Sequence, residues 1–522
     1  MKKNKISPVI LLIFFVGLIS CEDKKPSDLT KENIIPKPVS IIATGEYFTI
    51  LPETEITYQD KWTDLKPVSE YLAEKLRPAT GFKLEVKALS QLPPAGIFLE
   101  IVGDQIVPED ESYEIHITKA LLKLSAKSPA GLIRGIQTVR QILPAQIELQ
   151  EKQKGPWMIA TGKITDKPEY SYRGAMLDVA RHFFSVRDVK RFIDLISYYK
   201  INTLHLHLTD DQGWRIEIKS WPKLAEYGGT TKVGGGPGGY YTQDQYTEIV
   251  NYAKMVYVTI IPEVDMPGHT NAALSAYGEL NCDGKARRIY TGKDVGFSTL
   301  CTRKKVTYKF VEAVIKELAA LTPGPYIHIG GDESHATRKE EYAPFINQVL
   351  GIVKAQGKIM IGWDEISQAN IKSGSIAQYW ANSKNAATAV KKGAKIIMSP
   401  ARKMYLDMKY DSLTRIGQNW AAYIDIDSSY SWDPATFATG ISRENIIGVE
   451  APLWTETITN IEDIEYMVFP RLPGIAEIGW TPAKNREWKE YRERLAGHSE
   501  HFKTMGVNYY PSKLIPWPSE KK

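Results

Sequence analysis

The chain has 522 residues and a formal net charge of +5, from 66 basic and 61 acidic side chains. Hydrophobic residues make up 43% of it and charged residues 24%, which is typical of a globular protein with a sizeable core. The length exceeds that of one ordinary domain, so we expect two domains unless one is a large barrel. The small excess of basic residues is spread along the chain and no nucleic-acid-binding motif occurs, which argues against a nucleic-acid partner.

The N-terminus resembles the signal of a bacterial lipoprotein. A basic segment, MKKNK, precedes the apolar run PVILLIFFVGLI, which is too short and wrongly flanked for a stable membrane span. The run is followed by Ser20 and Cys21, similar to a lipobox, in which the signal is cleaved before a cysteine that becomes lipid-modified. We therefore expect residues 1–20 to be a signal peptide, residues 21–33 a polar tether, and the protein to be anchored by lipid in the cell envelope. Ordinary secretion with an incidental cysteine is the alternative.

If Cys21 is lipidated, two cysteines remain. Cys282 and Cys301 lie 19 residues apart. In an oxidising envelope compartment such a pair is typical of one disulfide that closes a loop. Two reduced, buried thiols are the alternative.

Residues 34–166 show a short and mixed pattern. Strand-like runs, namely FTIL, TEITY, FKLEV, IFLEIV, SYEIHI and LLKLSA, surround helical stretches at KPVSEYLAEKL and PAGLIRGIQTVRQIL. This pattern predicts a small α+β domain.

From residue 167 to 522 the pattern changes to regular alternation of apolar strands and helices. Two of the helices have starts that resemble capping boxes, at Ser185 to Asp188 and at Thr242 to Gln245. Eight strands alternating with helices predict a (β/α)8 barrel. A doubly wound open sheet is the second possibility, but no GxGxxG follows a first strand. The eight candidate strands are YRGAMLDV, NTLHLHL, VTIIPEVD, YIHIGGDE, KIMIGW, SIAQYW, KIIMSP and GVEAPLW.

Polar and aromatic side chains follow successive candidate strands. In a barrel of this kind the chemistry lies at the C-terminal ends of the strands. Indole rings stack on the apolar face of a pyranose and charged groups bind its hydroxyls, so this set predicts a carbohydrate site. Each residue alone could equally be a core aromatic or a solvated charge. The set is Asp178, Arg181, His207, Asp210, Asp211, Glu263, Asp265, His269, Asp332, Glu333, His335, Trp363, Trp380, Trp454 and Glu456.

Two other features suggest different chemistry. The H-x-H pair on the second candidate strand places His205 and His207 on one face, where they could bind zinc together with His269 and Asp332. The alternative for both histidines is packing and support of the neighbouring site. A second Asp-Glu pair, residues 364–365, follows Trp363, and this position fits a charge at a helix N-terminus better than catalysis.

Seven separated motifs closely resemble the family-20 glycoside hydrolases, the β-N-acetylhexosaminidases. The motifs occur in the order found in the family, and the resemblance covers nearly all of residues 170–515. Residues 34–166 are similar to the small domain that precedes the family's barrel. The resemblance implies removal of terminal, non-reducing β-linked N-acetylglucosamine or N-acetylgalactosamine from glycans with retention of configuration and without a cofactor. It implies that the nucleophile is the 2-acetamido oxygen of the substrate itself. The motifs are RGAMLDVARHFF, LHLHLTDDQGWRIEIKSWPKL, IPEVDMPGHTNAA, HIGGDE, QYW, YLDMKY and GVEAPLWTE.

The same resemblance implies a role for individual residues. Glu333 is expected to protonate the leaving oxygen and then to activate water, with Asp210 and His269 supporting it from behind. Asp332 is expected to stay ionised, to orient the acetamido N–H and to balance the positive charge of the intermediate. Tyr405 is expected to donate a hydrogen bond to the acetamido carbonyl. The remaining expected contacts are Trp363, Trp380 and Trp454 around the acetamido group and the ring, Arg181, Asp407 and Glu456 at the hydroxyls, Trp420 at the border of the pocket, and Asp265 near the rim.

A lipid-anchored protein that binds glycans without catalysis is the second functional hypothesis. It shares the aromatic rim and the envelope location. It does not require the acid pair at residues 332–333 backed by Asp210 and His269.

Overall fold

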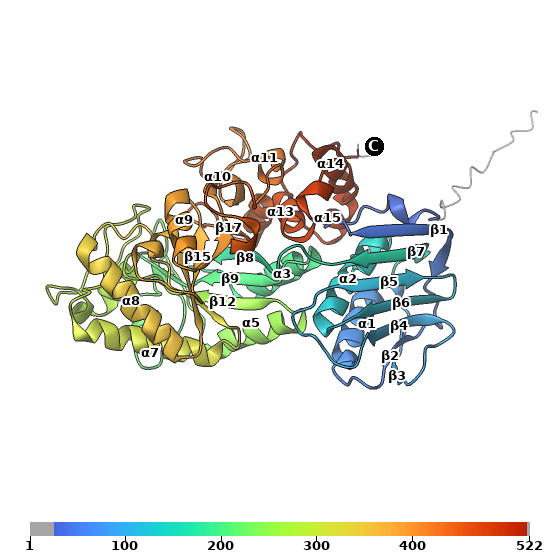
Figure 1. The fold of residues 1–522 in the computed structure, drawn as a ribbon, viewed down its shortest axis with the longest axis horizontal. Helices are drawn as coiled ribbons and strands as arrows, with labels where there is room; N and C mark the ends of the chain where they lie inside the picture. Colours follow the sequence, from blue (N-terminus) through green and yellow to red (C-terminus); the bar gives the residue numbers. More distant parts are fainter. Residues whose placement is uncertain (1–25, 519–522) are drawn as a thin grey trace, which may run out of the picture.

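The computed structural model describes residues 26–518, which form a small domain followed by a barrel (Figure 1). The predicted signal peptide and Cys21 lie outside the described residues. Within residues 26–518 no helix combines the length and the apolar composition needed to cross a membrane.

The small domain is a seven-stranded mixed sheet with two helices against it, α1 (Leu65–Thr80) and α2 (Pro129–Ile142), as the α+β prediction required. Four of the six predicted strand runs coincide with strands, FTIL overlaps the end of β1, and FKLEV shares only Val86 with β3. The sequence pattern did not predict a seventh strand, β7, which pairs with both β1 and β5. In the order β1-β7-β5-β6-β4-β2-β3, the strands are β1 (Ser40–Thr49), β7 (Met158–Asp166), β5 (Tyr113–Ile117), β6 (Leu121–Ala126), β4 (Gly96–Ile101), β2 (Ile56–Gln59) and β3 (Val86–Leu89).

The segment that precedes this sheet is more ordered than a tether. Leu29, in the short 3-10 helix η1 (Leu29–Lys31), is fully buried in the core of the small domain. The carbonyl of Asn33 contacts the imidazole of His498 on the barrel. The packed structure therefore begins before Ile34, the predicted first residue of the domain.

The rest of the chain forms a closed barrel of eight parallel strands, which confirms the predicted (β/α)8 fold. All eight candidate segments are barrel strands. In order around the barrel they are β8 (Tyr172–Asp178), β9 (Thr203–His207), β12 (Thr259–Glu263), β13 (Tyr326–His328), β14 (Ile359–Trp363), β15 (Ile376–Tyr379), β16 (Lys395–Met398) and β17 (Ile446–Leu453).

Helices connect and cover the strands. Both predicted capping boxes are present, with Ser185 capping α3 (Val186–Tyr198) and Thr242 capping α5 (Gln243–Met255). The other α-helices are α4 (Lys223–Glu226), α6 (Asn271–Ala276), α7 (Lys305–Leu321), α8 (Lys339–Ala355), α9 (Ser383–Lys391), α10 (Ala401–Met404), α11 (Ile426–Tyr430), α12 (Ile461–Val468), α13 (Arg471–Trp480), α14 (Trp488–Gly497) and α15 (Ser499–Thr504), and a short hairpin is formed by β10 (Thr209–Asp210) and β11 (Gly213–Trp214).

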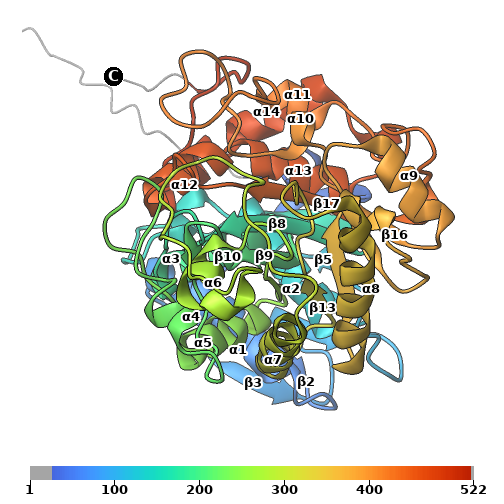
Figure 2. The ribbon, with the colours of Figure 1, turned by 90° about the vertical axis from the view of Figure 1, so that its left-hand side faces the viewer.

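The small domain closes the N-terminal end of the barrel. Every residue of α2 is buried, because this helix lies between the sheet and the barrel (Figure 1). Its Arg134 donates to the carbonyls of Val256 and Tyr257, just before β12. Figure 2 looks onto the opposite end of the barrel, where the C-terminal ends of the strands lie. That end is left free for a site.

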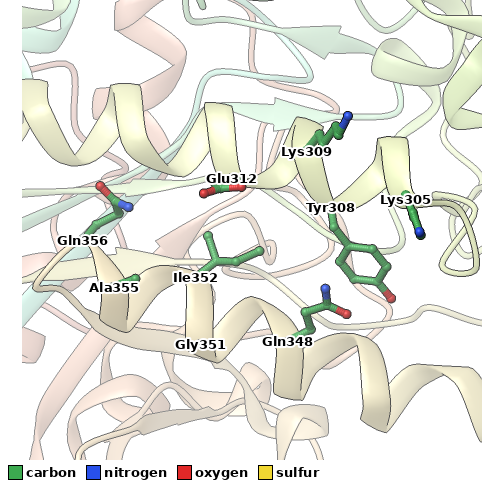
Figure 3. Close-up of a pocket in the computed structure, with 9 residues that line it drawn as sticks. All are labelled: Lys305, Tyr308, Lys309, Glu312, Gln348, Gly351, Ile352, Ala355 and Gln356. Atoms are coloured by element: carbon green, nitrogen blue, oxygen red, sulfur yellow. The ribbon is translucent and has the colours of Figure 1, made fainter.

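A groove of about 400 Å³ lies on the outer surface between α7 and α8 (Figure 3). Its lining includes Tyr308 and Ile352 together with several lysine and glutamine side chains. None of the residues predicted for the carbohydrate site lines it.

Glu111 joins the two domains through two buried ion pairs. Its carboxylate lies 2.7 Å from Arg134 Nε and 2.7 Å from Arg173 Nη2, and both guanidinium groups are buried. We expect Glu111→Ala to lower the free energy of unfolding by about 3–5 kcal/mol, because it leaves two buried cations without their partner. Urea denaturation measures this loss. The matched control is Glu85→Ala, which breaks surface ion pairs and should change stability far less, because solvent screens such pairs. Equal stability of Glu111→Ala and the wild type would contradict the prediction.

Candidate active site

The predicted site residues meet at the C-terminal end of the barrel, and each of the eight strands contributes. Arg181 follows β8, and Asp210 follows β9. Further residues follow in the loops after the other strands: Asp265 and His269 after β12, Asp332 and Glu333 after β13, Trp363 at the end of β14, Trp380 after β15, Tyr405, Asp407 and Trp420 after β16, and Trp454 and Glu456 after β17.

Two glycines turn the chain between β13 and the acid pair. Gly330 and Gly331 have φ angles of +65° and +94°, a conformation that favours glycine. A Cβ on Gly330 would lie 1.3 Å from Asp265 Oδ1, so no other residue fits there. Glu333 itself has a φ of +40°, which is strained for a residue with a side chain. This turn gives the neighbours different surroundings: the side chain of Asp332 is 12% exposed and that of Glu333 is 31% exposed.

His269 links the acid pair to a buried carboxylate. Its Nδ1 lies 3.2 Å from Asp210 Oδ1, and its Nε2 lies 3.7 Å from both Asp332 Oδ2 and Glu333 Oε2. Burial alone would lower the pKa of His269, but the charges of Asp210 and Asp332 hold it well above its usual value. Arg181 Nη2 pairs with Asp210 at 2.8 Å. The predicted pair of Asp210 and His269 therefore lies behind the two acids.

Aromatic rings form a box beside Asp332. The rings of Trp363 and Trp454 are 5.8 Å apart, and Tyr405 lies 6.2 Å from Trp454. Trp380 is nearly parallel to Tyr405 at 6.3 Å. Trp420 is 56% exposed and lies 6.0 Å from Tyr405, at the mouth of the box. The four tryptophans named from the sequence thus share one cluster with Tyr405.

Several buried polar atoms around this box lack a hydrogen-bond partner among the described residues. They are Asp332 Oδ1, Glu456 Oε2 and Arg181 Nε. An unpaired buried polar atom costs about 1–3 kcal/mol, so such atoms gathered in one pocket indicate the binding of a polar ligand. A carboxylate oxygen accepts a hydrogen bond, and a guanidinium N–H donates one, as hydroxyl and amide groups of a sugar require.

The carboxylates of the pocket are crowded. Burial, and then the charge of Asp265, raise the pKa of Asp332 well above its usual range. Burial and the charge of Glu456 do the same for the pKa of Asp407. Asp332 was expected to stay ionised, whereas its surroundings in the protein favour the neutral form. A cationic group placed against Asp332 would favour its ionised form.

The buried histidines on β9 do not form the zinc site that the sequence left open as an alternative. His205 lies between Glu263 and Glu450, at 2.8 and 2.9 Å. His207 lies between Asp178 and Asp265, at 3.0 and 2.9 Å. Burial would lower the pKa of His205, but these two glutamates raise it to about 9. A protonated imidazole with a carboxylate at each nitrogen offers no lone pair to a metal. The described residues include clusters of histidine and carboxylate, but none combines His205, His207, His269 and Asp332.

Asp265 was predicted to lie near the rim of the pocket. In the structure its side chain is buried, with 2% of the residue exposed. Its Oδ2 faces His207, and its Oδ1 contacts the position of Gly330. Burial, and then the charge of Glu263, raise its pKa to about 6. Asp265 therefore borders the turn that carries the acid pair, rather than the entrance of the pocket.

The two acids of the second Asp-Glu pair, residues 364–365, make different contacts. Asp364 and Glu365 begin the 3-10 helix η4 (Asp364–Gln368). Asp364 accepts hydrogen bonds from the backbone N–H groups of residues 380–382, which directly precede α9, so its charge lies near the start of that helix. Glu365 instead accepts the indole N–H of Trp380 at 3.1 Å. Burial, and then the charge of Asp364, raise its pKa to about 8. Sequence analysis missed this contact with the aromatic box.

Glu263 was also missed as an anchor of the box. It accepts the indole N–H of Trp363 at 2.9 Å and faces His328 at 2.8 Å. The signal that could have identified both anchors is the position of each glutamate next to a barrel strand end. A buried indole N–H needs an acceptor.

Comparison with known proteins agrees with this geometry. The sequence model of glycosyl hydrolase family 20, catalytic domain, matches residues 170–483, and that of glycosyl hydrolase family 20, domain 2, matches residues 31–167. A β-N-acetylhexosaminidase from Cellulomonas fimi is 38% identical over 488 residues, which cover 93% of this chain and 97% of that protein.

Two solved structures are similar over almost their whole length. The family-20 β-N-acetylhexosaminidase from Streptomyces coelicolor A3(2) has a TM-score of 0.91 and 47% identity, and the match covers 95% of this chain and all of the other. A mutant β-hexosaminidase from Streptomyces plicatus, in complex with the product GlcNAc, has a TM-score of 0.90 and 47% identity over 93% of this chain and 98% of the other. The chain therefore belongs to glycosyl hydrolase family 20.

Proposed function

We propose that this protein removes terminal, non-reducing β-linked N-acetylglucosamine or N-acetylgalactosamine from glycans, with retention of configuration. It is a β-N-acetylhexosaminidase of family 20. The observation that carries the mechanism is the position of Asp332 Oδ1, which is buried beside the aromatic box and next to Glu333 and has no hydrogen-bond partner within residues 26–518. The comparisons give no support to a glycan-binding protein without catalysis.

In the first step the carbonyl oxygen of the substrate's 2-acetamido group attacks C1 of the sugar. The bond between C1 and the leaving oxygen breaks, and Glu333 gives its proton to that oxygen. The product is a cyclic oxazolinium ion, which carries one positive charge. Tyr405, 3% exposed, donates its hydroxyl hydrogen to the attacking carbonyl oxygen, and the box of indole rings fixes the acetamido group against C1.

In the second step Glu333, now a carboxylate, takes a proton from water. The oxygen of this water attacks C1 from the side that the leaving group has vacated, and the oxazolinium ring opens to restore the acetamido group. Two displacements at C1 retain its configuration. No protein nucleophile is needed, so the two carboxyl groups do not have to face each other across the bond.

Asp332 balances the charge that forms between these steps. Its unpaired Oδ1 accepts the acetamido N–H, which turns the carbonyl oxygen towards C1. The surroundings of Asp332 raise its pKa, and the positive oxazolinium ion lowers it again. The carboxylate is thus stabilised most when the intermediate is present, which is the requirement for catalysis.

The two acids can be tested separately. We expect Glu333→Gln to lower kcat/KM for β-linked N-acetylglucosamine disaccharides by roughly 10²–10⁴-fold, because the leaving oxygen loses its proton donor. Asp332→Asn should lower it by roughly 10²–10³-fold, because the amide cannot balance the positive charge. The control is Glu340→Gln, an exposed acid at the start of α8.

Steady-state kinetics measure these effects, and NMR of the first product gives its anomeric form. An inverted product would contradict the mechanism. Equal turnover of an analogue with a 2-hydroxyl in place of the acetamido group would also contradict it. A chelator should leave the activity unchanged, because both nitrogens of His205 and of His207 already face carboxylates.

Glu365 predicts a dependence of stability on pH. Its pKa is about 8 in the folded protein, whereas that of an unfolded glutamate is about 4.3. Between these values the folded state binds more protons than the unfolded state, so the contribution of Glu365 to stability falls as the pH rises. The slope is about 1.4 kcal/mol per pH unit. Glu365→Gln keeps an acceptor for the Trp380 indole but cannot ionise.

We therefore expect the stability of Glu365→Gln relative to the wild type to increase from pH 5 to pH 8. Urea denaturation of both proteins at several pH values measures the difference. Both proteins share the other titratable groups around Glu365. These are Asp364 on the same helix, and Asp332, Glu333, Tyr342 and Tyr405 on neighbouring elements. A difference that stays constant with pH would refute the assigned ionisation.

The envelope location is a further part of the proposal. It is supported by the basic segment, the apolar run and the cysteine at position 21. A lipid on Cys21 should make the protein partition into a detergent phase, and Cys21→Ala should move it to the aqueous phase with unchanged activity. The control is Cys282→Ala, which removes one partner of the internal disulfide and should leave the partitioning unchanged. Aqueous partitioning of the wild type would contradict lipidation.

A further inference from the structure

The imidazole of His269 directs one ring nitrogen at the acid pair without forming a hydrogen bond. Its Nδ1 lies 3.2 Å from Asp210 Oδ1. Its Nε2 is buried and has no hydrogen-bond partner within residues 26–518. Asp332 Oδ2 and Glu333 Oε2 both lie 3.7 Å from this nitrogen, which is beyond hydrogen-bond distance. An unpaired buried nitrogen between two carboxylates indicates a place for a ligand.

The three side chains offer a donor set that suits a transition metal. One nitrogen or oxygen atom from each of His269, Asp332 and Glu333 lies within 4.8 Å of the other two. In a tetrahedral Zn²⁺ site the donor atoms lie about 2.0–2.2 Å from the ion and therefore about 3.4 Å from one another. The separations of 3.7 Å around His269 Nε2 are only slightly larger. Small side-chain movements are therefore enough to bring all three donors onto one ion.

Asp210 supports His269 in the way that metal sites require. A histidine that binds a metal almost always donates its other N–H to a carboxylate, which fixes the ring and its tautomer. His269 Nδ1 donates to Asp210 in this manner. Burial would lower the pKa of His269, but the charges of Asp210 and Asp332 raise it, so Nε2 carries a proton in the free enzyme. A bound Zn²⁺ takes the place of this proton, which passes to solvent.

The charges around the acid pair select the kind of ion. Burial, and then the charge of Asp265, disfavour the carboxylate form of Asp332 and raise its pKa. A divalent cation between Asp332 and Glu333 would balance both negative charges at once. Mg²⁺ and Ca²⁺ prefer sites made of oxygen atoms alone, whereas an imidazole nitrogen favours Zn²⁺ and related transition metals.

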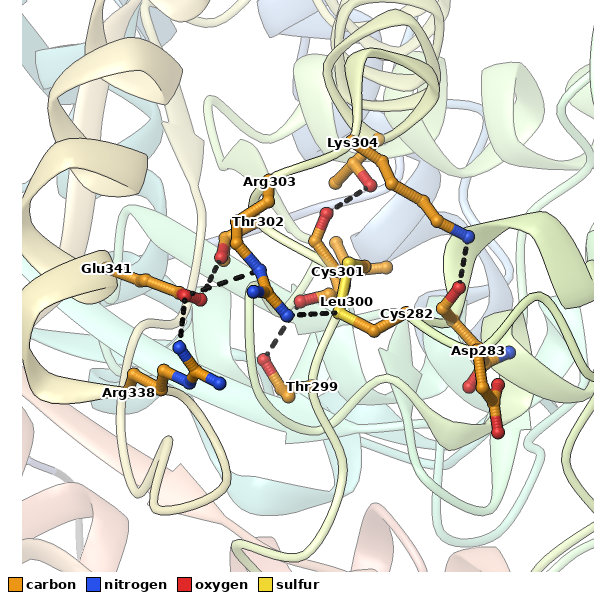
Figure 4. Close-up of a disulfide and its surroundings, with 12 residues drawn as sticks. Cys282, Asp283, Thr299, Leu300, Cys301, Thr302, Arg303, Lys304, Arg338 and Glu341 are labelled. Carbon is orange, nitrogen blue, oxygen red and sulfur yellow. Dashed lines mark hydrogen bonds and ion pairs between the residues drawn. A yellow bond between two sulfur atoms is a disulfide. The ribbon is translucent and has the colours of Figure 1, made fainter.

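A loop closed by a disulfide holds the backbone of Glu333 in place. Cys282 and Cys301 are joined, as the sequence predicted, and enclose residues 283–300 (Figure 4). Gly296, at a φ of +76°, brings this loop close to the acid pair. A Cβ there would lie 3.0 Å from the carbonyl oxygen of Glu333. Metal ligands need such support from their surroundings, because a loosely held ligand weakens the site.

We propose that His269, Asp332 and Glu333 form an inhibitory binding site for a divalent transition metal such as Zn²⁺. The ion occupies the two acids that the substrate needs. Asp332 cannot accept the acetamido N–H, and Glu333 cannot carry its proton, while both are bound to the metal. Metal and substrate therefore exclude each other, so Zn²⁺ should raise KM and leave kcat unchanged. The inhibition rests on the proposed function, whereas the metal site does not.

Isothermal titration calorimetry with zinc chloride alone tests the site without turnover. The full chain, freed of metal by a chelator that is then removed, should bind one Zn²⁺ ion and should bind Mg²⁺ far more weakly. His269→Ala should lower the affinity for Zn²⁺ at least tenfold, roughly the loss caused by removing even a group that supports a ligand. Glu333→Gln, at a partly exposed position, should have a similar effect and gives a second reading if His269→Ala does not fold. The matched control is His335→Ala, an exposed histidine next to the site, which should leave the affinity unchanged.

Steady-state kinetics with the β-linked disaccharide of N-acetylglucosamine provide the second measurement. Added Zn²⁺ should raise KM at constant kcat, and a chelator should restore the original KM. Equal affinity for Zn²⁺ in the wild type and in Glu333→Gln would overturn the proposal, as would a loss of affinity in His335→Ala alone. Inhibition that lowers kcat without raising KM would overturn it too. Zinc binding at this site in a protein that hydrolyses no disaccharide would refute the proposed function and leave the metal site intact.

Discussion

The turn at Gly330 and Gly331 is the constraint on which the site depends. It brings the backbone so close to Asp265 that a side chain at residue 330 would overlap the carboxylate. It ends in the strained backbone of Glu333, and it directs two adjacent acids to different surroundings. Asp332 is buried beside the aromatic box, and Glu333 is partly exposed beside the loop of residues 283–300. Without this turn the side chains of two adjacent acids could not contact two different parts of one substrate.

Positively charged side chains inside the barrel offset the repulsion between these closely spaced carboxylates. His205, His207 and His269 each contact two or more carboxylates, and Arg181 contacts two. Burial disfavours all of these charges, but each cation and its partners offset one another. Asp332 is only weakly compensated, because the imidazole of His269 lies 3.7 Å from its carboxylate. A carboxylate that the protein compensates only weakly is therefore the one proposed to meet the positive intermediate.

The fold and most of the site could be predicted from the sequence, because the signals are local. Each barrel strand is a short apolar run, and most site residues follow closely on one of them. Tyr405, Asp407 and Trp420 lie farther along the segment after β16, and only the family resemblance pointed to them. What could not be predicted depends on long-range packing. The rim position expected for Asp265 was wrong because the paired glycines bring β13 against it, and the role of Glu365 was missed because its partner, Trp380, lies 15 residues away on the next strand end. Strand β7 was missed for the same reason, since it pairs with strands far from it in the chain.

The packing of the small domain across the N-terminal end of the barrel sets the direction in which the pocket faces. The described chain begins at Pro26, which lies against the small domain beside Trp157. Cys21 precedes Pro26 by five positions, a distance of at most roughly 17 Å for a fully extended chain. A lipid at Cys21 would thus keep the small domain between the bilayer and the barrel, and the pocket would face away from the membrane. Such an enzyme would trim glycans that arrive from the surrounding medium rather than those that lie in the membrane beneath it.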